Sequence, residues 1–151
     1  MVARLEHTGA TESALVIENV GPSIARNVEV EFEPPLPTHE TTPDGQDSLL
    51  PFVVNRYAKT ILAWPPGQQM RNTFYILSDE RDDEDRPMNV DNISRDTCVL
   101  FKYEDDAGEL YSDRFSLDPT LYEGETWSHR VRRRNGEIVA EYDGAPWLRR
   151  P

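Results

Sequence analysis

Residues 27–33 read Asn-Val-Glu-Val-Glu-Phe-Glu, and this stretch decides the fold class. Val28, Val30 and Phe32 fall on one side of an extended chain and the polar residues on the other. This is the period-two pattern of a half-buried strand. Two prolines follow and end the strand, because proline donates no hydrogen bond to a ladder. The stretch therefore predicts a β-strand.

The same pattern recurs on both sides of that stretch. Residues 14–20 alternate around Leu15 and Ile17, and we expect them to pair with residues 27–33 as an antiparallel neighbour across the turn at residues 19–23. Further strands are expected at residues 49–54, 59–64, 70–77, 97–103 and 109–117. About seven short strands separated by turn signals predict an all-β, antiparallel β-sandwich.

The charge divides the chain into an acidic body and a basic end. The 151 residues hold 28 acidic and 16 basic side chains, which gives a formal net charge of −12. Residues 126–151 carry six arginines and three acids, a net charge of +3, which leaves −15 for residues 1–125. We expect a sandwich domain over residues 1–120 and a C-terminal β-hairpin with an extended arm over residues 121–151.

The dipeptide Asn135-Gly136 is the strongest hairpin signal in the chain. A two-residue turn there predicts the pairs Arg134–Glu137, Arg133–Ile138, Arg132–Val139, Val131–Ala140, Arg130–Glu141 and His129–Tyr142. A hairpin of two strands is marginally stable alone, so we expect it to lie on its own domain or on a partner. The expected partner-binding residues are Arg130, Arg132, Arg133, Trp147, Leu148, Arg149 and Arg150.

Four motifs connect the chain with a known type of domain. They are LVIENVGPSIARNVEV over residues 15–30, PPGQ over residues 65–68, YEDDAGELY over residues 103–111, and FSLD over residues 115–118. Together they resemble bacterial immunoglobulin-like domains of the cell-adhesion-related type and uncharacterised proteins of actinobacteria and their phages. The resemblance covers residues 1–120 and implies an immunoglobulin-like sandwich that presents a surface to a partner. It rests on turn and packing residues, so it implies a fold and not a chemistry.

The sequence carries no strong motif for catalysis or for metal binding. His7, His39 and His129 fall in three different expected elements, and no nucleophile elbow, Walker loop or dinucleotide-binding glycine pattern occurs. The single cysteine, Cys98, lies in the apolar run 97–101 and is expected to be an inert buried thiol. We expect no enzyme activity, no cofactor and no metal site.

The acidic balance also bears on partners and location. A pI near 4.6 argues against a body that binds nucleic-acid phosphates, and the arginines of residues 130–134 are better suited to an acidic protein surface. No apolar run is long enough to span a membrane, and the first residues lack the apolar stretch of a signal peptide. We therefore expect a protein of the cytoplasm or of a virus particle.

These features predict a non-enzymatic interaction or structural module, such as an accessory or capsid-decoration subunit of a phage virion. Its expected contact is the C-terminal hairpin and arm, with another protein or with a second copy. The alternative is a small-ligand module that binds carbohydrate or calcium. Tyr57, Trp64 and Trp127 would stack on a carbohydrate, and the acidic block 79–85 would bind calcium, although we expect this block to be a solvated loop. An enzyme is the third alternative, and it would need the dispersed histidines and carboxylates to meet in a pocket.

Overall fold

The computed structural model describes residues 1–8, 11–43, 45–81, 83, 87–118, 129–134 and 137–142. These residues form two four-stranded antiparallel sheets, one short helix and a separate two-stranded sheet. The first sheet has the order β1 (Val2–His7), β2 (Glu12–Glu18), β5 (Gln69–Arg81) and β6 (Pro87–Asn89). The second sheet has the order β4 (Ile61–Trp64), β3 (Ala25–Glu33), β7 (Cys98–Glu104) and β8 (Leu110–Ser116).

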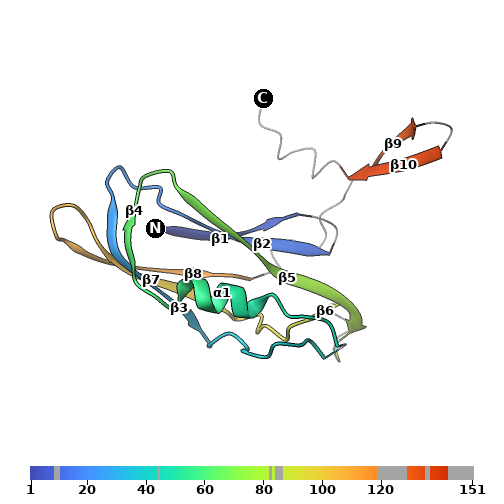
Figure 1. The fold of residues 1–151 in the computed structure, drawn as a ribbon, viewed down its shortest axis with the longest axis horizontal. Helices are drawn as coiled ribbons and strands as arrows, with labels where there is room; N and C mark the ends of the chain where they lie inside the picture. Colours follow the sequence, from blue (N-terminus) through green and yellow to red (C-terminus); the bar gives the residue numbers. More distant parts are fainter. Residues whose placement is uncertain are drawn as a thin grey trace.

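The two larger sheets pack face to face as a β-sandwich (Figure 1). Strands β1, β2 and β5 are neighbours in one sheet, and β3, β7 and β8 are neighbours in the other. The second and third strands of the chain therefore lie in opposite sheets, as strands B and C do in an immunoglobulin-like sandwich. The all-β sandwich predicted from the sequence is confirmed.

The core lies between the two sheets. The buried apolar side chains of the described residues run from Met1 to Leu117, so the sandwich has a core of its own. The largest side chains with almost no exposed surface are Trp64, Phe74, Phe101, Leu15, Ile17 and Leu50. Burying each of them contributes roughly 1.5–3 kcal/mol. No helix among the described residues is long and apolar enough to cross a membrane.

The predicted pairing of residues 14–20 with residues 27–33 is wrong. Strand β2 pairs with β1 and β5, whereas β3 pairs with β4 and β7. Both strands present an apolar face, and these faces meet across the interior instead of lying side by side. Packing them against each other removes more apolar surface from water than edge-to-edge pairing would.

The strand expected at residues 49–54 is instead a helix, α1 (Leu50–Tyr57). Proline at position 51 lies in the first turn, where its missing N–H costs nothing. A short apolar run has no periodicity that separates a strand from a helix, which explains the error. The buried residues of the helix, at helical spacing, are Leu50, Val53 and Tyr57.

Strand β1 was not among the strands predicted from the sequence. It pairs with β2 over its whole length, from Val2 opposite Glu18 to His7 opposite Ser13. Ala3 and Leu5 are buried, and the charged residues Arg4 and Glu6 that alternate with them are half-buried. Strand β6 was not predicted either, and it pairs with the far end of β5.

Strands β9 (His129–Arg134) and β10 (Glu137–Tyr142) pair with each other in the predicted register. Arg134 lies opposite Glu137 at one end of the ladder, and His129 lies opposite Tyr142 at the other. The turn residues 135 and 136 lie outside the described residues. Within the described part of the chain, this two-stranded sheet shares no ladder with the sandwich.

Candidate functional site

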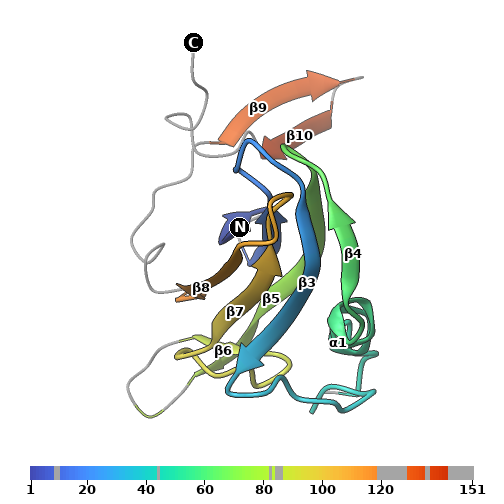
Figure 2. The ribbon, with the colours of Figure 1, turned by 90° about the vertical axis from the view of Figure 1, so that its left-hand side faces the viewer.

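A groove beside the outer edge of β3 is the strongest candidate site. Strand β4 covers only the first part of this edge, because its last partner on β3 is Val28, opposite Ile61. Residues 29–33 pair with β7 on one side, and no described strand pairs with them on the other. Helix α1 lies beside this uncovered part of β3 (Figure 2). The edge therefore offers backbone groups that can pair with a further strand.

The first half of the groove is apolar. It has a volume of about 300 Å³ and is lined by Val30, Glu31, Phe32, Pro35, Leu36, Thr38, Val54, Tyr57 and Ala58. Phe32 joins the groove to the core, because its ring centroid lies 6.2 Å from that of Tyr57 and 6.1 Å from that of Phe74. The floor of the groove is thus held by packed aromatic rings.

The second half of the groove is more polar and adjoins the first. It has a volume of about 310 Å³, shares Val30, Glu31, Tyr57 and Ala58 with the first half, and adds Glu29, Lys59 and Thr60. A ligand lying along β3 would pass from an apolar hollow to one with two carboxylates. We call the two halves together the β3 groove.

The glutamates of β3 give the groove an acidic rim. Glu31 pairs with Lys102 at 3.3 Å, and Glu33 pairs with Arg114 at 3.1 Å. All four side chains are more than half exposed, so each pair contributes little stability and can exchange partners. Glu29 is exposed and has no ion pair with any other described residue.

Two large apolar side chains are exposed on the elements that flank the groove. Phe52 on α1 is 69% exposed, and Leu62 on β4 is 74% exposed. Neither side chain contributes to the core, so neither exposure is explained by folding.

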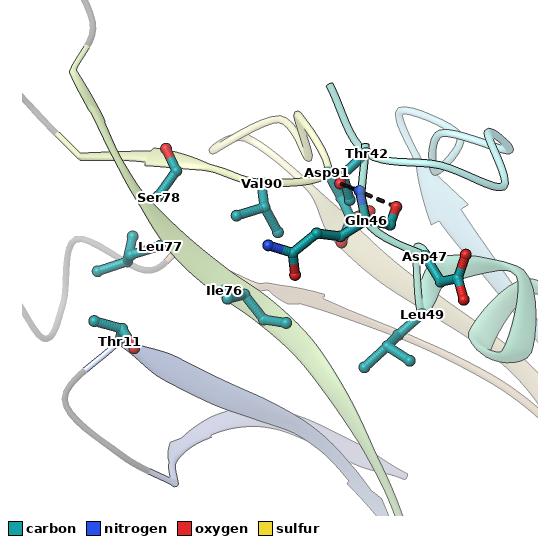
Figure 3. A pocket seen from close by; sticks show the side chains of 10 residues that line it. All are labelled: Thr11, Thr42, Gln46, Asp47, Leu49, Ile76, Leu77, Ser78, Val90 and Asp91. Atoms are coloured by element: carbon teal, nitrogen blue, oxygen red, sulfur yellow. Dashed lines mark hydrogen bonds between the residues drawn. The ribbon is translucent and has the colours of Figure 1, made fainter. Parts of the chain in front are cut away.

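A second hollow, of about 360 Å³, lies where β5 meets the loop before α1 (Figure 3). Thr42 and Gln46 close part of it, because the Thr42 hydroxyl donates to the Gln46 carbonyl and accepts from the Gln46 N–H, both at 3.1 Å. Ile76, Leu77 and Val90 form the apolar side. The remaining residues that line it are Thr11, Asp47, Leu49, Ser78 and Asp91.

Asp91 is a buried carboxylate at the wall of this second hollow. Its side chain is 3% exposed, and its Oδ1 accepts a hydrogen bond from the Ser48 hydroxyl at 2.5 Å and lies 3.3 Å from Nε2 of His39. A catalytic triad needs the histidine between the serine and the carboxylate. Here the carboxylate stands between the other two, so the group ties the loop of residues 39–48 to Asp91 and does not activate the serine.

A third hollow, of about 280 Å³, lies where two of the sequence motifs meet. It is lined by Met1, Asn19, Gly21, Pro22, Ser23, Ile24, Ala25, Tyr103, Asp105 and Tyr111. The rings of Tyr103 and Tyr111 stack with their centroids 5.4 Å apart. The Tyr103 hydroxyl donates to Asp113 at 2.8 Å, and burial followed by this hydrogen bond raises the pKa of Tyr103 to about 12. The hydroxyl therefore stays protonated at neutral pH.

Asn19 explains the first motif in physical terms. Its side-chain amide donates to the carbonyls of Ser23 at 2.9 Å and of Trp64 at 2.8 Å, and its oxygen accepts from the N–H of Gly21 at 3.0 Å. The amide thus joins the crossover between the sheets to the end of β4. The motif residues at this hollow serve turn and packing roles.

The predicted partner-binding residues are only partly described. Arg130, Arg132 and Arg133 lie in β9 at the predicted register positions. The residues of the arm, 147–150, lie outside the described residues. The β3 groove was not predicted, because the strand expected at residues 59–64 is nearly as long as the one at residues 27–33, and neither stretch shows that β4 pairs with β3 or that this pairing stops at Val28.

The residues proposed for the alternative functions do not form open sites. Trp64 is fully buried and Tyr57 is 4% exposed, so neither ring is available for stacking on a carbohydrate, and Trp127 lies outside the described residues. Among the described residues, no three histidine, cysteine or acidic side chains cluster as a metal site. Strand β5 continues to Arg81, so the expectation of a loop is wrong for the start of the acidic block.

The sequence predicted that Cys98 is buried, but the structure shows it half-buried, so this prediction is wrong. Its sulfur lies 3.5 Å from Nη2 of Arg114, which donates to it. The position at the start of β7 leaves this side chain at the margin of the core, where the apolar run alone gives no indication of depth.

A comparison with protein families places the chain. A family model described as a domain of unknown function (DUF8453) matches residues 1–123. The chain belongs to this family. The match spans both sheets of the sandwich and ends before β9. No curated protein and no solved structure matches the chain.

Proposed function

We propose that this DUF8453 protein is a non-enzymatic protein-interaction module that associates through its C-terminal hairpin and arm. The β3 groove carries the proposal. It combines an uncovered strand edge with an apolar hollow, the two features by which sheets bind an extended peptide, and it adds an acidic rim that attracts a basic one. Phe52 on α1 and Leu62 on β4 are exposed apolar side chains on the flanking elements.

The charge of the chain supports the same proposal. Residues 1–125 carry a net charge of −15 and residues 126–151 carry +3, so the two parts of different copies attract each other. Such attraction accelerates encounter and selects orientation more than it adds affinity, and it weakens with salt. Contacts between unlike surfaces of successive copies build rings or filaments, which suits an accessory subunit of a larger assembly such as a virion.

Truncation tests this function. The full chain and a chain ending at Asp118 are compared by light scattering over a range of protein concentrations, at low salt and at about 0.5 M salt. We expect the full chain to associate at low salt and to dissociate at high salt. The truncated chain should stay monomeric, and circular dichroism should show it folded because the described core ends at Leu117. Equal association by both chains contradicts the proposal, as does a full chain that is monomeric at every concentration and salt.

A further inference from the structure

We propose that the β3 groove receives the C-terminal tail of a second copy, residues 146–151, as an added antiparallel strand. This inference rests on the proposed function and names its partner. The tail reads Pro-Trp-Leu-Arg-Arg-Pro. It supplies one large aromatic ring, two cations, and four consecutive residues that have N–H donors between two prolines.

The backbone of the tail suits the uncovered edge of β3. Residues 29–33 of β3 have no strand partner on the α1 side within the described chain. Residues 147–150 can pair with this edge, and the prolines at 146 and 151 prevent the ladder from extending further. A strand of about four residues matches the length of edge that β4 leaves uncovered.

The order of side chains in the tail matches the order of the two hollows. In a strand, alternate residues share a face and lie about 6.6–6.8 Å apart. Phe32 and Glu29 are three residues apart and so lie on opposite faces of β3, and Trp147 and Arg150 have the same spacing in the tail. If the tail runs antiparallel to β3 with Trp147 opposite Phe32, Trp147 enters the apolar hollow and Arg150 lies opposite Glu29 at the adjoining hollow. The opposite direction would place the arginine in the apolar hollow.

The energetics of each contact follow from the lining residues. An enclosed aromatic side chain buries roughly 150–250 Å² of surface, and tryptophan and arginine are the residues that most often dominate interfaces. Glu29 has no described ion-pair partner, and Glu31 holds only the exposed Lys102, so both carboxylates are available to a guanidinium. Lys59 lines the same hollow, but the two glutamates leave it with a net negative charge.

A charge exchange in the full-length chain tests the proposal. One variant carries Glu29→Arg and Glu31→Arg, and the other carries Arg149→Glu and Arg150→Glu. Each variant alone should be monomeric in analytical ultracentrifugation at low salt, because its groove and its tail then have charges of the same sign. An equimolar mixture should associate again, because each tail meets a groove of opposite sign. A simple folding defect would not be repaired by mixing.

Single variants refine the test. Arg150→Glu should weaken association at least 10-fold more than Arg149→Glu, although the two changes alter net charge equally, because only residue 150 shares the face of the sheet with Glu29 and Glu31. Trp147→Ala should weaken association about 30-fold, the loss typical of an interface anchor. A variant with Glu12→Arg and Asp96→Arg, two exposed acids away from the groove, is the charge-matched control and should associate at least as well as the unchanged chain.

The outcomes separate this inference from the proposed function. If the groove variant associates like the unchanged chain while truncation at Asp118 abolishes association, the tail docks elsewhere, and only the inference is overturned. If the full unchanged chain is monomeric throughout, both fail. If the emission contributed by Trp147, taken as the difference between the unchanged chain and Trp147→Ala, stays blue-shifted in the monomer at every protein concentration, the tail lies on its own domain, which also overturns docking between copies.

Discussion

Replacing Asn19 with alanine should strongly destabilise the sandwich. Asn19 is only 3% exposed. Its side chain donates hydrogen bonds to the carbonyls of Ser23 and Trp64 and accepts one from the N–H of Gly21. Each such bond contributes about 1 kcal/mol net, and a buried group that loses its partner costs about 1–3 kcal/mol. The summed expectation is a loss of about 3 kcal/mol in the free energy of unfolding.

Urea denaturation followed by circular dichroism measures this loss. With a slope of about 1.5 kcal/mol per molar urea, a loss of 3 kcal/mol lowers the midpoint by about 2 M. The control is Gln69→Ala, which removes an amide with one hydrogen bond, to Glu18, at an exposed site and should cost no more than about 1 kcal/mol. Equal losses for the two variants would refute the claim that burial of the Asn19 network matters.

Two further predictions concern buried polar groups. Burial raises the pKa of Tyr57 to about 12, so the stability that its protonated form provides is complete below about pH 10 and is lost as the pH rises through 12. Between pH 9 and 12, the free energy of unfolding of Tyr57→Phe should therefore fall by about 2–3 kcal/mol less than that of the unchanged chain, as measured by urea titrations. Parallel curves of stability against pH for the two chains would contradict this. Asp91→Ala should lower the free energy of unfolding by about 1–3 kcal/mol and speed limited proteolysis within residues 39–48, because the Ser48 hydroxyl loses its acceptor. Asp91→Asn keeps an acceptor and should cost less than half as much. Equal effects of the two variants would show that this hydrogen bond is not what holds the loop.

Several strands could be predicted from the sequence because their information is local. The alternation of residues 27–33 indicates β3, and Val28 and Val30 are indeed buried. The Asn-Gly dipeptide fixes the register of the β9–β10 ladder, since a two-residue turn leaves one pairing. Charge division along the chain is likewise a property of the sequence alone.

Other features depended on contacts between distant segments. The sheet to which a strand belongs is set by which apolar faces pack best across the interior, so the separation of β2 from β3 could not follow from either strand alone. The run at residues 49–54 became a helix because Leu50, Val53 and Tyr57 fill the side of the sandwich between β3 and β5. Tertiary packing decides such ambiguous segments.

The candidate site shows the same division. The sequence by itself determined an acidic β-sandwich, a basic hairpin and a tail with one tryptophan and two arginines. Only the tertiary structure decided that β4 ends opposite Val28 and that α1 lies beside the remaining edge of β3. A groove is the space that packed elements leave between them, so its position and lining depend on the relative placement of segments and not on any one of them.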